Sequence, residues 1–459
     1  MKVRLPVRII SAMHYRRING LVQVLSARLV ACGITLSRAP GGGRTVCLIT
    51  PYPPNRHGLS EFSQSLVRSF EKRAMRQLNL HVVSFTDDND KTSLADGHTP
   101  IYRTLRSGSN NPLSTFKSIP GLLRLMILLA RLRPQIVHVE FEFTRYYGGT
   151  MGEPFIFVIT LAKGMFGFRL ISTLQTVWSR RWLMQRLGEV IKIGGIRAVL
   201  SNIYASYYDM LEGLLVRTCD MVLLPTLTLG LPMYQELKTK YGHYAGTRIL
   251  EVPHGVYKVS ESREVKKTDS MTILSFGAIR RGKGQESLIE MVHRLKSEYS
   301  VRVKLVIAGF TGSGDTGYLQ ELTNLVVKYE LGEQVTIIPR FLELDEVVRW
   351  HQVADVVIIS YSRMVGPSGA LMWAMATETV PIMMTGETWR PEVPGIVVHN
   401  QEEMMRVIVG LVKDDLALRQ IRGEIVKYRT TYSFDSVAKL HLQLYQDLSA
   451  GQKKYSSLD

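Results

Sequence analysis

A strand, a basic glycine loop and a helix follow one another between Ile273 and Glu290, in the sequence ILSFGAIRRGKGQESLIE. Open α/β sheets bind phosphorylated ligands where a glycine-rich turn leads from a strand into the N-terminus of a helix. The loop places Arg280 and Lys283 where both cations can approach a diphosphate and neutralise the charge on a leaving phosphate. By itself the pattern also fits an ordinary solvated turn.

A second candidate for phosphate binding begins at Ser368, after an apolar strand predicted for Val356–Ile359. The sequence GPSGAL at residues 366–371 is typical of a helix start, because Ser368 can cap it and small residues let a ligand approach the backbone. The alternative, compatible with the first, is a plain capped helix that packs its apolar side chains into the core. The candidate contacts are Ser368, Gly369, Ala370 and Leu371.

The two segments, in this order and at this separation, resemble the nucleotide-sugar domain of GT-B glycosyltransferases, specifically the retaining family 4 (glycosyl transferases group 1). The family's loop reads FGxIRxxKG, and Phe276–Gly284 matches it with Arg280 and Lys283 in the diphosphate-contacting positions. The resemblance implies an α/β chain of two Rossmann-like, doubly wound domains that face a central cleft, with a C-terminal helix returning to the first domain. It also implies sugar transfer from a nucleoside-diphosphate sugar.

Four further segments resemble the family in the expected order, and each supplies a candidate residue. They are 46–62 with Gly58 in the glycine loop, 136–149 with Glu142 in an acidic-aromatic loop, 170–178 with Gln175, and 249–256 with the junction pair His254 and Gly255. The backbone of Arg340, Phe341 and Leu342, after a strand predicted at 335–338, is the expected nucleobase contact.

The chain departs from the family at two places. Gln175 stands where many relatives have a histidine near the reacting sugar, and because glutamine does not titrate, it cannot act there as an acid or base. Val365 and Trp373 stand where the family often carries a pair of glutamates. The resemblance implies that the leaving diphosphate accepts the acceptor's proton, so that the protein positions the substrates and stabilises charge.

The predicted catalytic set is therefore Arg280, Lys283, Glu142 and Gln175. Glu142 is the candidate for orienting an acceptor or sugar hydroxyl, with a solvated loop carboxylate as the alternative. No CxxC, HxxxH or HExxH motif occurs, so we expect neither a metal nor another cofactor, and the nucleotide sugar is a substrate.

At 459 residues, the chain exceeds what one hydrophobic core usually supports. We predict a basic N-terminal extension at 1–44, an acceptor-side domain at 45–258, a nucleotide-sugar domain at 259–432, and a returning helix with a tail at 433–459. The three cysteines form no evident disulfide framework, which favours a reducing compartment.

The net charge of +17 is distributed unevenly. Residues 1–45 carry eight Lys and Arg and no acid, and residues 101–139, which include a basic apolar helix predicted at 116–132, carry six and no acid. We therefore expect a cytoplasmic protein that contacts the anionic, cytoplasmic face of a membrane peripherally. A solvated basic face and core packing of the leucines are the alternatives. Residues 1–30 also share the Arg-rich, acid-free character of a mitochondrial transit peptide, but not its serine content.

Nucleic acid is not an expected partner, because the basic charge comes without a recognition helix, a zinc finger or an aromatic platform. The expected acceptor is a lipid-linked glycan or a glycolipid. Two alternatives stay open: a subunit of a membrane assembly that binds a nucleotide sugar without transferring it, and a transferase that joins soluble sugars and has no lipid affinity.

Overall fold

The computed structural model describes residues 44–74, 77–86, 93–106, 114–148, 151–180, 183–184, 197–226, 232–242, 248–259, 270–312, 315–360, 368–385 and 393–450. The predicted N-terminal extension lies outside these ranges up to residue 43, as do Val365 and residues 185–196. By residue contacts the chain divides into two compact units. Unit 1 comprises Met1–Pro225, Met233–Val252 and Ala438–Asp459, and unit 2 comprises Thr226–Pro232 and Pro253–Val437.

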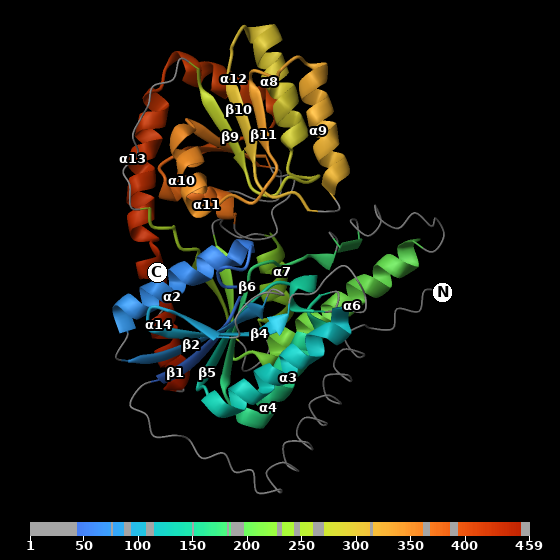
Figure 1. The fold of residues 1–459 in the computed structure, drawn as a ribbon, viewed down its shortest axis with the longest axis vertical. Helices are drawn as coiled ribbons and strands as arrows, with labels where there is room; N and C mark the ends of the chain where they lie inside the picture. Colours follow the sequence, from blue (N-terminus) through green and yellow to red (C-terminus); the bar gives the residue numbers. More distant parts are fainter. Residues whose placement is uncertain are drawn as a thin grey trace, which may run out of the picture. The chain divides into compact units, whose positions relative to one another are not determined.

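The described part of unit 1 contains an eight-stranded sheet in the order β3-β4-β2-β1-β5-β6-β7-β8 (Figure 1). Its strands are β1 (Arg44–Ile49), β2 (Leu78–Thr86), β3 (Ser93–Asp96), β4 (Thr99–Arg106), β5 (Ile136–Phe141), β6 (Arg169–Leu174), β7 (Met221–Thr226) and β8 (Arg248–Pro253). Strands β2, β1, β5, β6 and β7 pair in parallel, as do β2 and β4, whereas β3 pairs antiparallel with β4.

The chain order reverses between β1 and β5, since β2 and β4 extend the sheet on one side of β1 and the later strands extend it on the other. The carboxyl ends of the two strands at such a switch point form a crevice in which open α/β sheets bind ligands. All six residues of β5 are buried, as expected of a parallel strand covered on both faces.

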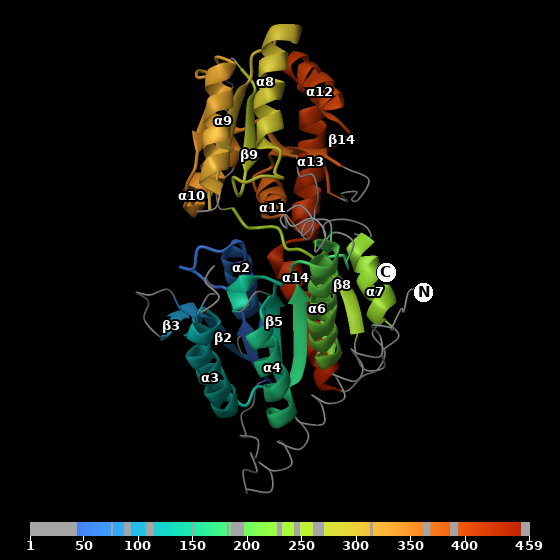
Figure 2. The ribbon, with the colours of Figure 1, turned by 90° about the vertical axis from the view of Figure 1, so that its right-hand side faces the viewer.

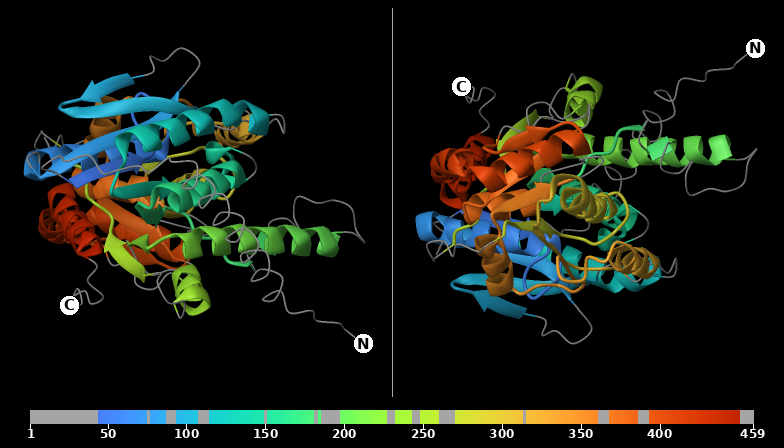
Figure 3. Two further views of the ribbon diagram at one scale, coloured as in Figure 1. Left: turned by 90° about the horizontal axis from the view of Figure 1, so that it is seen from below. Right: turned by 90° about the horizontal axis from the view of Figure 1, so that it is seen from above.

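Helices cover both faces of this sheet. They are α2 (Gly58–Ala74), α3 (Ser114–Leu132), α4 (Glu153–Phe166), α6 (Arg197–Thr218), α7 (Pro232–Tyr241) and α14 (Phe434–Ser449), with a short 3₁₀ helix at Arg145–Tyr147. Successive side chains of a strand face opposite ways: Phe141 of β5 stacks on Phe155 of α4, whereas His138 of β5 bonds to Tyr445 of α14. Helices α3, α4 and α6 therefore lie on the face opposite α14, side by side (Figures 2 and 3).

The described part of unit 2 contains a six-stranded parallel sheet in the order β11-β10-β9-β12-β13-β14. Its strands are β9 (Thr272–Phe276), β10 (Lys304–Ala308), β11 (Val335–Ile338), β12 (Val356–Ile359), β13 (Val380–Met384) and β14 (Ile396–Val398). Its helices are α8 (Gln285–Tyr299), α9 (Thr316–Lys328), α10 (Leu344–Val353), α11 (Gly369–Ala376), α12 (Gln401–Lys413) and α13 (Leu416–Thr431). The order reverses between β9 and β12, which places a second switch point there.

The predicted α/β class with two parallel, doubly wound sheets is confirmed. The C-terminal helix also returns to the first domain as predicted, because α14 contributes Tyr445 and Leu448 to the core of unit 1. Among the described helices, none combines the length and hydrophobicity that crossing a membrane requires.

Candidate active site

The loop between β9 and α8 (residues 277–284, the β9–α8 loop) lies at the switch point of unit 2. Two backbone hydrogen bonds fasten its first half to the end of β10 and the residues after it: Gly277 N–H donates to Ala308 O (3.0 Å), and Ile279 N–H donates to Phe310 O (2.8 Å). Ile279 is completely buried. The loop is therefore a fixed element of the sheet edge and not a loose connection.

The three cations of this loop have different surroundings. Arg281 pairs with Glu321 and lies over the ring of Tyr318, 5.4 Å from its centroid. Arg280 is exposed, and its guanidinium has no ion-pair or hydrogen-bond partner among the residues that the structure describes. Lys283 is half-buried. Of the two arginines, Arg280 is thus the one available to an anionic ligand.

Gln285, the first residue of α8, holds the β9–α8 loop through side-chain hydrogen bonds. This buried side chain donates from Nε2 to Ala278 O (3.1 Å) and accepts from the Tyr318 hydroxyl at Oε1 (3.2 Å). Tyr318 also donates to Glu286. Because an unpaired buried amide is costly, these bonds fix the amide and hold the loop backbone in one conformation.

Strand β12 ends at Ile359, and the next residue, Ser360, contacts the first of the two predicted phosphate-binding segments. Buried Ser360 donates from Oγ to Lys283 O (2.8 Å). Next to it, Gly284 has a φ of 76°, and a Cβ at this position would lie 2.7 Å from Ser360 O. The structure therefore brings the β9–α8 loop against the end of β12, as expected for two strands at a switch point. Residues 361–367 lie outside the described ranges.

Helix α11 begins as the sequence predicts. Ser368 is its N-cap, and the Ser368 hydroxyl accepts a hydrogen bond from Leu371 N–H (3.3 Å). Gly369 is exposed and Ala370 is buried. The first backbone N–H groups of a helix have no acceptor inside it, so this end of α11 is suited to an anion. The other residues of α11 are buried, so the capped core helix, the alternative to a phosphate site, holds as well.

Trp373 of α11 belongs to an aromatic cluster that also contains His254, Tyr257 and Phe434. Buried Trp373 stacks on Tyr257 with ring centroids 4.2 Å apart, and Tyr257 contacts Phe434 at 5.6 Å. A Cβ on Gly255 would lie 2.7 Å from the Phe434 ring, so a side chain here would have to displace that ring. His254 donates from Nδ1 to Gly255 O, and burial lowers the pKa of His254 to about 4. The junction pair is therefore a packing element of unit 2.

The segment Arg340–Leu342, the predicted nucleobase contact, leads from β11 into α10. Both terminal nitrogens of Arg340 bond to the Glu346 carboxylate, at 2.6 and 2.8 Å. Leu342 is buried, and Glu343 and Glu346 form a capping box at the start of α10. The Arg340 side chain is held by Glu346, so the part of this segment that can contact a nucleobase is its backbone.

At the switch point of unit 1, the predicted Gly58 and Glu142 lie near a histidine that the sequence analysis did not single out. Gly58 is exposed and begins α2. His57 accepts at Nδ1 from Leu59 N–H (3.2 Å), so its proton is on Nε2, which lies 3.7 Å from Glu142 Oε2. The His57 ring contacts Tyr146 at 4.3 Å. Burial lowers the pKa of His57, and Glu142 opposes that shift only in part.

Gln175 directly follows β6 and is almost completely buried. Its Nε2 donates to Glu140 Oε2 at 2.7 Å, and its backbone N–H donates to Phe141 O at 2.9 Å. Glu140, on β5, has no exposed surface, and burial raises its pKa to about 7. Glu140 is not among the site residues predicted from sequence. The signal was present, because an acid inside the mainly apolar strand IVHVEF must have a buried partner.

Arg103 corrects one detail of the predicted basic surface. It is one of the six cations of residues 101–139, but it is buried and faces the interior. Its Nη1 donates to Tyr52 O, Phe85 O and Asn55 Oδ1, each at 3.3 Å, and its Nη2 donates to Pro53 O. Arg103 therefore fixes the loop between β1 and α2, and it is unable to contact a lipid.

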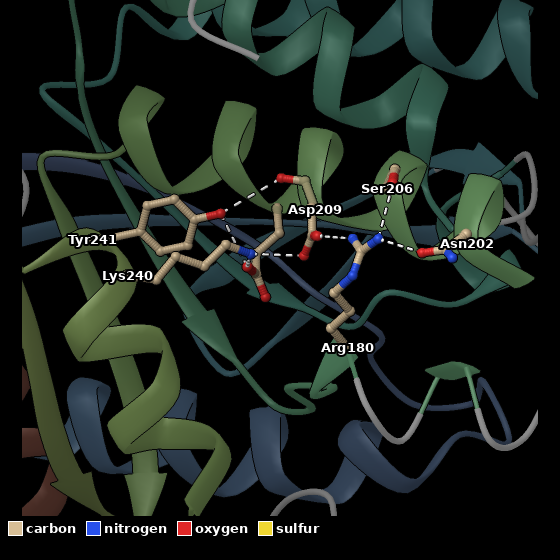
Figure 4. A network of polar contacts seen from close by, with 7 residues as sticks. Arg180, Asn202, Ser206, Asp209, Lys240 and Tyr241 are labelled. Atoms are coloured by element: carbon tan, nitrogen blue, oxygen red, sulfur yellow. Dashed lines mark hydrogen bonds and ion pairs between the residues drawn. The ribbon is translucent and has the colours of Figure 1, made fainter. Parts of the chain in front are cut away.

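A polar network fastens the segment after Gln175 to α6 and α7 (Figure 4). Its members are Arg180, Asn202, Ser206, Asp209, Glu212, Lys240 and Tyr241. Arg180 and Lys240 approach the Asp209 carboxylate from opposite sides, and Lys240 also bonds to Glu212 at 2.6 Å. The basic residue Arg180 is thus committed to an internal ion pair. A pocket beside the network is lined by Val177, Trp178, Asp209, Glu212, Glu236, Leu237 and Lys240.

Within the described ranges, no three His, Cys, Asp or Glu side chains gather as ligands of a metal ion. Independence of metal stays a prediction. The site residues themselves also stay predictions, although the structure brings together Lys283 with Ser360 after β12, and His57, the neighbour of Gly58, with Glu142.

Comparisons with known proteins agree with this geometry. Residues 258–420 match the family model described as glycosyl transferases group 1. No curated protein sequence matches the chain. Among solved structures, sucrose-phosphate synthase from Thermosynechococcus elongatus is similar with a TM-score of 0.67 and 14% identity, over 89% of this chain and 100% of that one.

Two further structures are similar over almost their whole length. Anabaena HepE, in complex with UDP and glucose, has a TM-score of 0.61 and 13% identity, over 89% of this chain and 100% of that one. A glycosyltransferase from Rickettsia africae has a TM-score of 0.61 and 13% identity, over 90% of this chain and 100% of that one. The chain therefore has the GT-B fold, and its residues 258–420 match the glycosyl transferases of group 1.

Proposed function

We propose that the chain is a retaining glycosyltransferase of family 4 that moves a sugar from a nucleoside-diphosphate sugar to an acceptor hydroxyl. One observation carries the proposal. At the switch point of unit 2, the basic β9–α8 loop presents Arg280 and is hydrogen-bonded through Lys283 to the end of β12. This is where open α/β sheets bind ligands, and here the side chains on offer are cationic.

The charges of the loop suit the chemistry. Breaking the bond between sugar and phosphate leaves a nucleoside diphosphate with an added negative charge. Arg280 can bind phosphate oxygens with its forked guanidinium, Lys283 adds a second positive charge, and the N-terminus of α11 adds its backbone N–H groups. In the retaining reaction, the leaving oxygen takes the acceptor's proton, so no titrating side chain is required at Gln175.

The donor that we propose to test first is a UDP-sugar. HepE, which shares the fold of this chain, has been solved with UDP-glucose. A panel of UDP-, GDP- and ADP-sugars with a membrane lipid extract as acceptor then identifies the nucleotide. The transfer is proposed to be metal-independent, so turnover should be unchanged in EDTA.

The decisive variants are Arg280→Ala and Arg281→Ala, which remove the same charge from neighbouring positions. Arg280→Ala should lower kcat/KM about a hundredfold or more, as loss of a preorganised contact to the leaving group does. Arg281→Ala should stay within about threefold of the native chain, because its guanidinium is paired with Glu321. Release of nucleoside diphosphate is the measurement.

Other results would change the assignment. Equal loss in both variants would show that the loop contributes only general positive charge. Binding of a nucleotide sugar with no turnover for any acceptor would favour the non-catalytic subunit. Turnover with soluble sugars and none with lipid extract would favour the soluble-acceptor transferase.

The proposed acceptor is a lipid-linked glycan or glycolipid at the cytoplasmic face of an anionic membrane. The support comes from α3, where Ile119, Leu123 and Ile127 are 44%, 59% and 53% exposed and recur every four residues. Arg124 and Arg131 are exposed on the same helix, which has no acidic residue. Adjacent helices add the exposed residues Phe157, Val199, Leu200 and Ile203. An apolar stripe flanked by arginines complements an anionic lipid surface.

A further inference from the structure

A buried chain of polar side chains leads from Gln175 to the C-terminal helix of unit 1. Gln175 Nε2 lies 2.7 Å from Glu140 Oε2. Glu140 and Thr173 occupy paired register positions on β5 and β6, and Thr173 Oγ1 lies 2.7 Å from His138 Nε2. The other ring nitrogen of His138, Nδ1, lies 2.7 Å from the hydroxyl of Tyr445 on α14. All five side chains are at most 3% exposed.

When Glu140 is ionised, the hydrogen bonds between these buried side chains can all be donated in one direction, towards its carboxylate. Tyr445 then donates to His138 Nδ1, and His138 donates from Nε2 to Thr173 Oγ1. The Thr173 hydroxyl is left to donate to its register partner Glu140, whose Oε1 also lies 3.5 Å from His138 Nε2. Gln175 donates to the same carboxylate through its NH₂ group. A carboxylate accepts hydrogen bonds and donates none, so it terminates the chain from both sides.

Protonation of Glu140 changes which group of the Gln175 amide it can hydrogen-bond to. A carboxylic acid carries an O–H that must find an acceptor when it is buried. Turning the Gln175 amide over would supply its carbonyl oxygen as that acceptor. The two ends of an amide are alike in shape and opposite in hydrogen bonding, so this reversal needs no repacking.

We propose that Glu140 is a positioning residue that sets which end of the Gln175 amide faces outward at the carboxyl edge of the unit 1 sheet. Ionised Glu140 holds the NH₂ group and leaves the carbonyl oxygen to accept from a substrate hydroxyl. Protonated Glu140 holds the carbonyl and leaves the NH₂ group, which does not accept. The inference rests on the proposed function, since the reversal affects turnover only if a sugar hydroxyl lies beside Gln175.

Among the ionisable groups packed around Glu140, Glu140 itself is the one that titrates near neutral pH. Burial raises the pKa of Glu140 to about 7, and hydrogen bonds from Gln175 and Thr173 oppose the rise only in part. Burial keeps the pKa of His138 well below its ordinary value, and His441, stacked on it from α14, acts in the same direction. Burial likewise raises the pKa values of Tyr147, after β5, and Tyr445, on α14, so both remain neutral.

The first arm of the test measures the protonation of Glu140 without using activity. A carboxyl group whose pKa is higher in the folded than in the unfolded chain stabilises the fold at low pH, and that contribution is lost as the pH rises through about 7. The thermal midpoint of Glu140→Gln, compared with the native chain, should therefore rise between pH 5.5 and pH 8.5. Glu298→Gln on α8 should show no such relative rise, because hydrogen bonds from Arg294 lower the pKa of Glu298 and so keep its titration below this pH range.

The second arm measures turnover against pH with the donor found above. Native kcat should rise about tenfold from pH 6 to pH 8, while KM for the donor stays constant. This is the change expected when turnover follows the ionised fraction of a carboxyl group with a pKa of about 7. Glu140→Gln should lose this rise, and Glu298→Gln should keep it. Tyr445→Phe removes only the O–H at the far end of the series of hydrogen bonds. It should keep the rise but move its midpoint to higher pH.

Several results would overturn the inference. They are a native pH profile that is flat between pH 6 and pH 8, a rise that persists in Glu140→Gln, and a Tyr445→Phe midpoint that does not move. If Glu140→Gln does not fold, Tyr445→Phe alone decides. If no donor is turned over by the native chain, the proposed transferase fails, and the thermal midpoints still decide whether Glu140 titrates near pH 7.

Discussion

Gly284 has a backbone conformation that residues with a side chain adopt only at a cost. Its φ is 76°, and a Cβ would lie 2.7 Å from Ser360 O. The left-handed conformation alone costs about 1–2 kcal/mol for an L-residue. Gly284→Ala should therefore destabilise unit 2 by at least that amount, and it should weaken UDP binding, because relief of the clash breaks the bond between Ser360 and Lys283. Urea unfolding and calorimetric titration with UDP measure both effects.

The matched control is Gly410→Ala. Gly410 lies inside α12, and a Cβ there would meet nothing within 4 Å. Alanine is favoured over glycine in a helix by about 1 kcal/mol, so this variant should be as stable as the native chain or more so, with unchanged UDP affinity. If Gly284→Ala behaves like Gly410→Ala, the constraint at Gly284 is not real.

Single residues show what a sequence reveals about a site and what it conceals. Arg280 and Lys283 could be predicted because the loop that carries them is continuous in the chain. Glu140 could not be assigned to Gln175, because the two are 35 positions apart and meet only through the register of neighbouring strands. The same reason hides the pairing of Arg281 with Glu321, which separates two arginines that look equivalent in sequence.

At the scale of elements, sequence predicts the position of α3 better than its orientation. The predicted helix at 116–132 corresponds to Ser114–Leu132. Its apolar residues surround the helix, so periodicity alone does not separate core from surface. The structure does: Leu122, Leu125 and Leu129 are buried, and the stripe defined above by Ile119, Leu123 and Ile127 faces solvent. Both core packing and an exposed apolar surface are therefore present in one helix.

Flotation with lipid vesicles tests the exposed stripe of α3. The double variant Leu123→Ser/Ile127→Ser should reduce binding to vesicles rich in phosphatidylglycerol about tenfold or more, since each buried apolar side chain contributes about 1.5–3 kcal/mol. Vesicles of phosphatidylcholine alone should bind the native chain weakly, because the flanking arginines then have no anionic partner.

Val327→Ser is the control for that change in hydrophobicity. Val327 is 73% exposed on α9 of unit 2, so its replacement removes exposed apolar surface from a different helix and should leave binding unchanged. A chain without residues 1–40 separates the contribution of the basic extension. Native binding that survives the double variant would exclude α3 as the membrane contact, and no binding by any chain would remove the membrane from the proposal.

At the scale of the whole molecule, the fold of unit 1 depends on the far end of the chain. Helix α14 buries Leu444, Tyr445 and Leu448 in that unit. Loss of such side chains costs about 2–5 kcal/mol each, which together rivals the stability of a typical domain. A chain that ends at residue 437, the last residue of unit 2, should therefore lose hydrogen-exchange protection in β1 and β5, while β9 and β10 of unit 2 stay protected. Exchange measured by mass spectrometry reports each strand.

A chain that ends at residue 450 keeps all of α14 and serves as the control. It should match the full chain in every strand. Equal protection of β5 in both truncated chains would mean that α14 is dispensable for unit 1.

The order of the motifs is enough to predict the two-sheet fold, because strand, loop and helix alternate in a fixed sequence and each signature has a known place in it. It does not predict the division into units. Contacts divide helix α14 between the units, with Phe434–Val437 in unit 2 and the residues from Ala438 in unit 1, and no motif marks that change. Such assignments depend on packing between distant segments, which local patterns do not record.

The return of α14 also has a consequence for synthesis. A ribosome releases the chain from its N-terminus, yet unit 1 lacks part of its core until residues near Leu448 have emerged. Unit 2 is complete earlier, once Val437 is free. We therefore expect unit 2 to complete its core before unit 1. In the nascent unit 1, His138 and its neighbours stay uncovered until α14 packs against them.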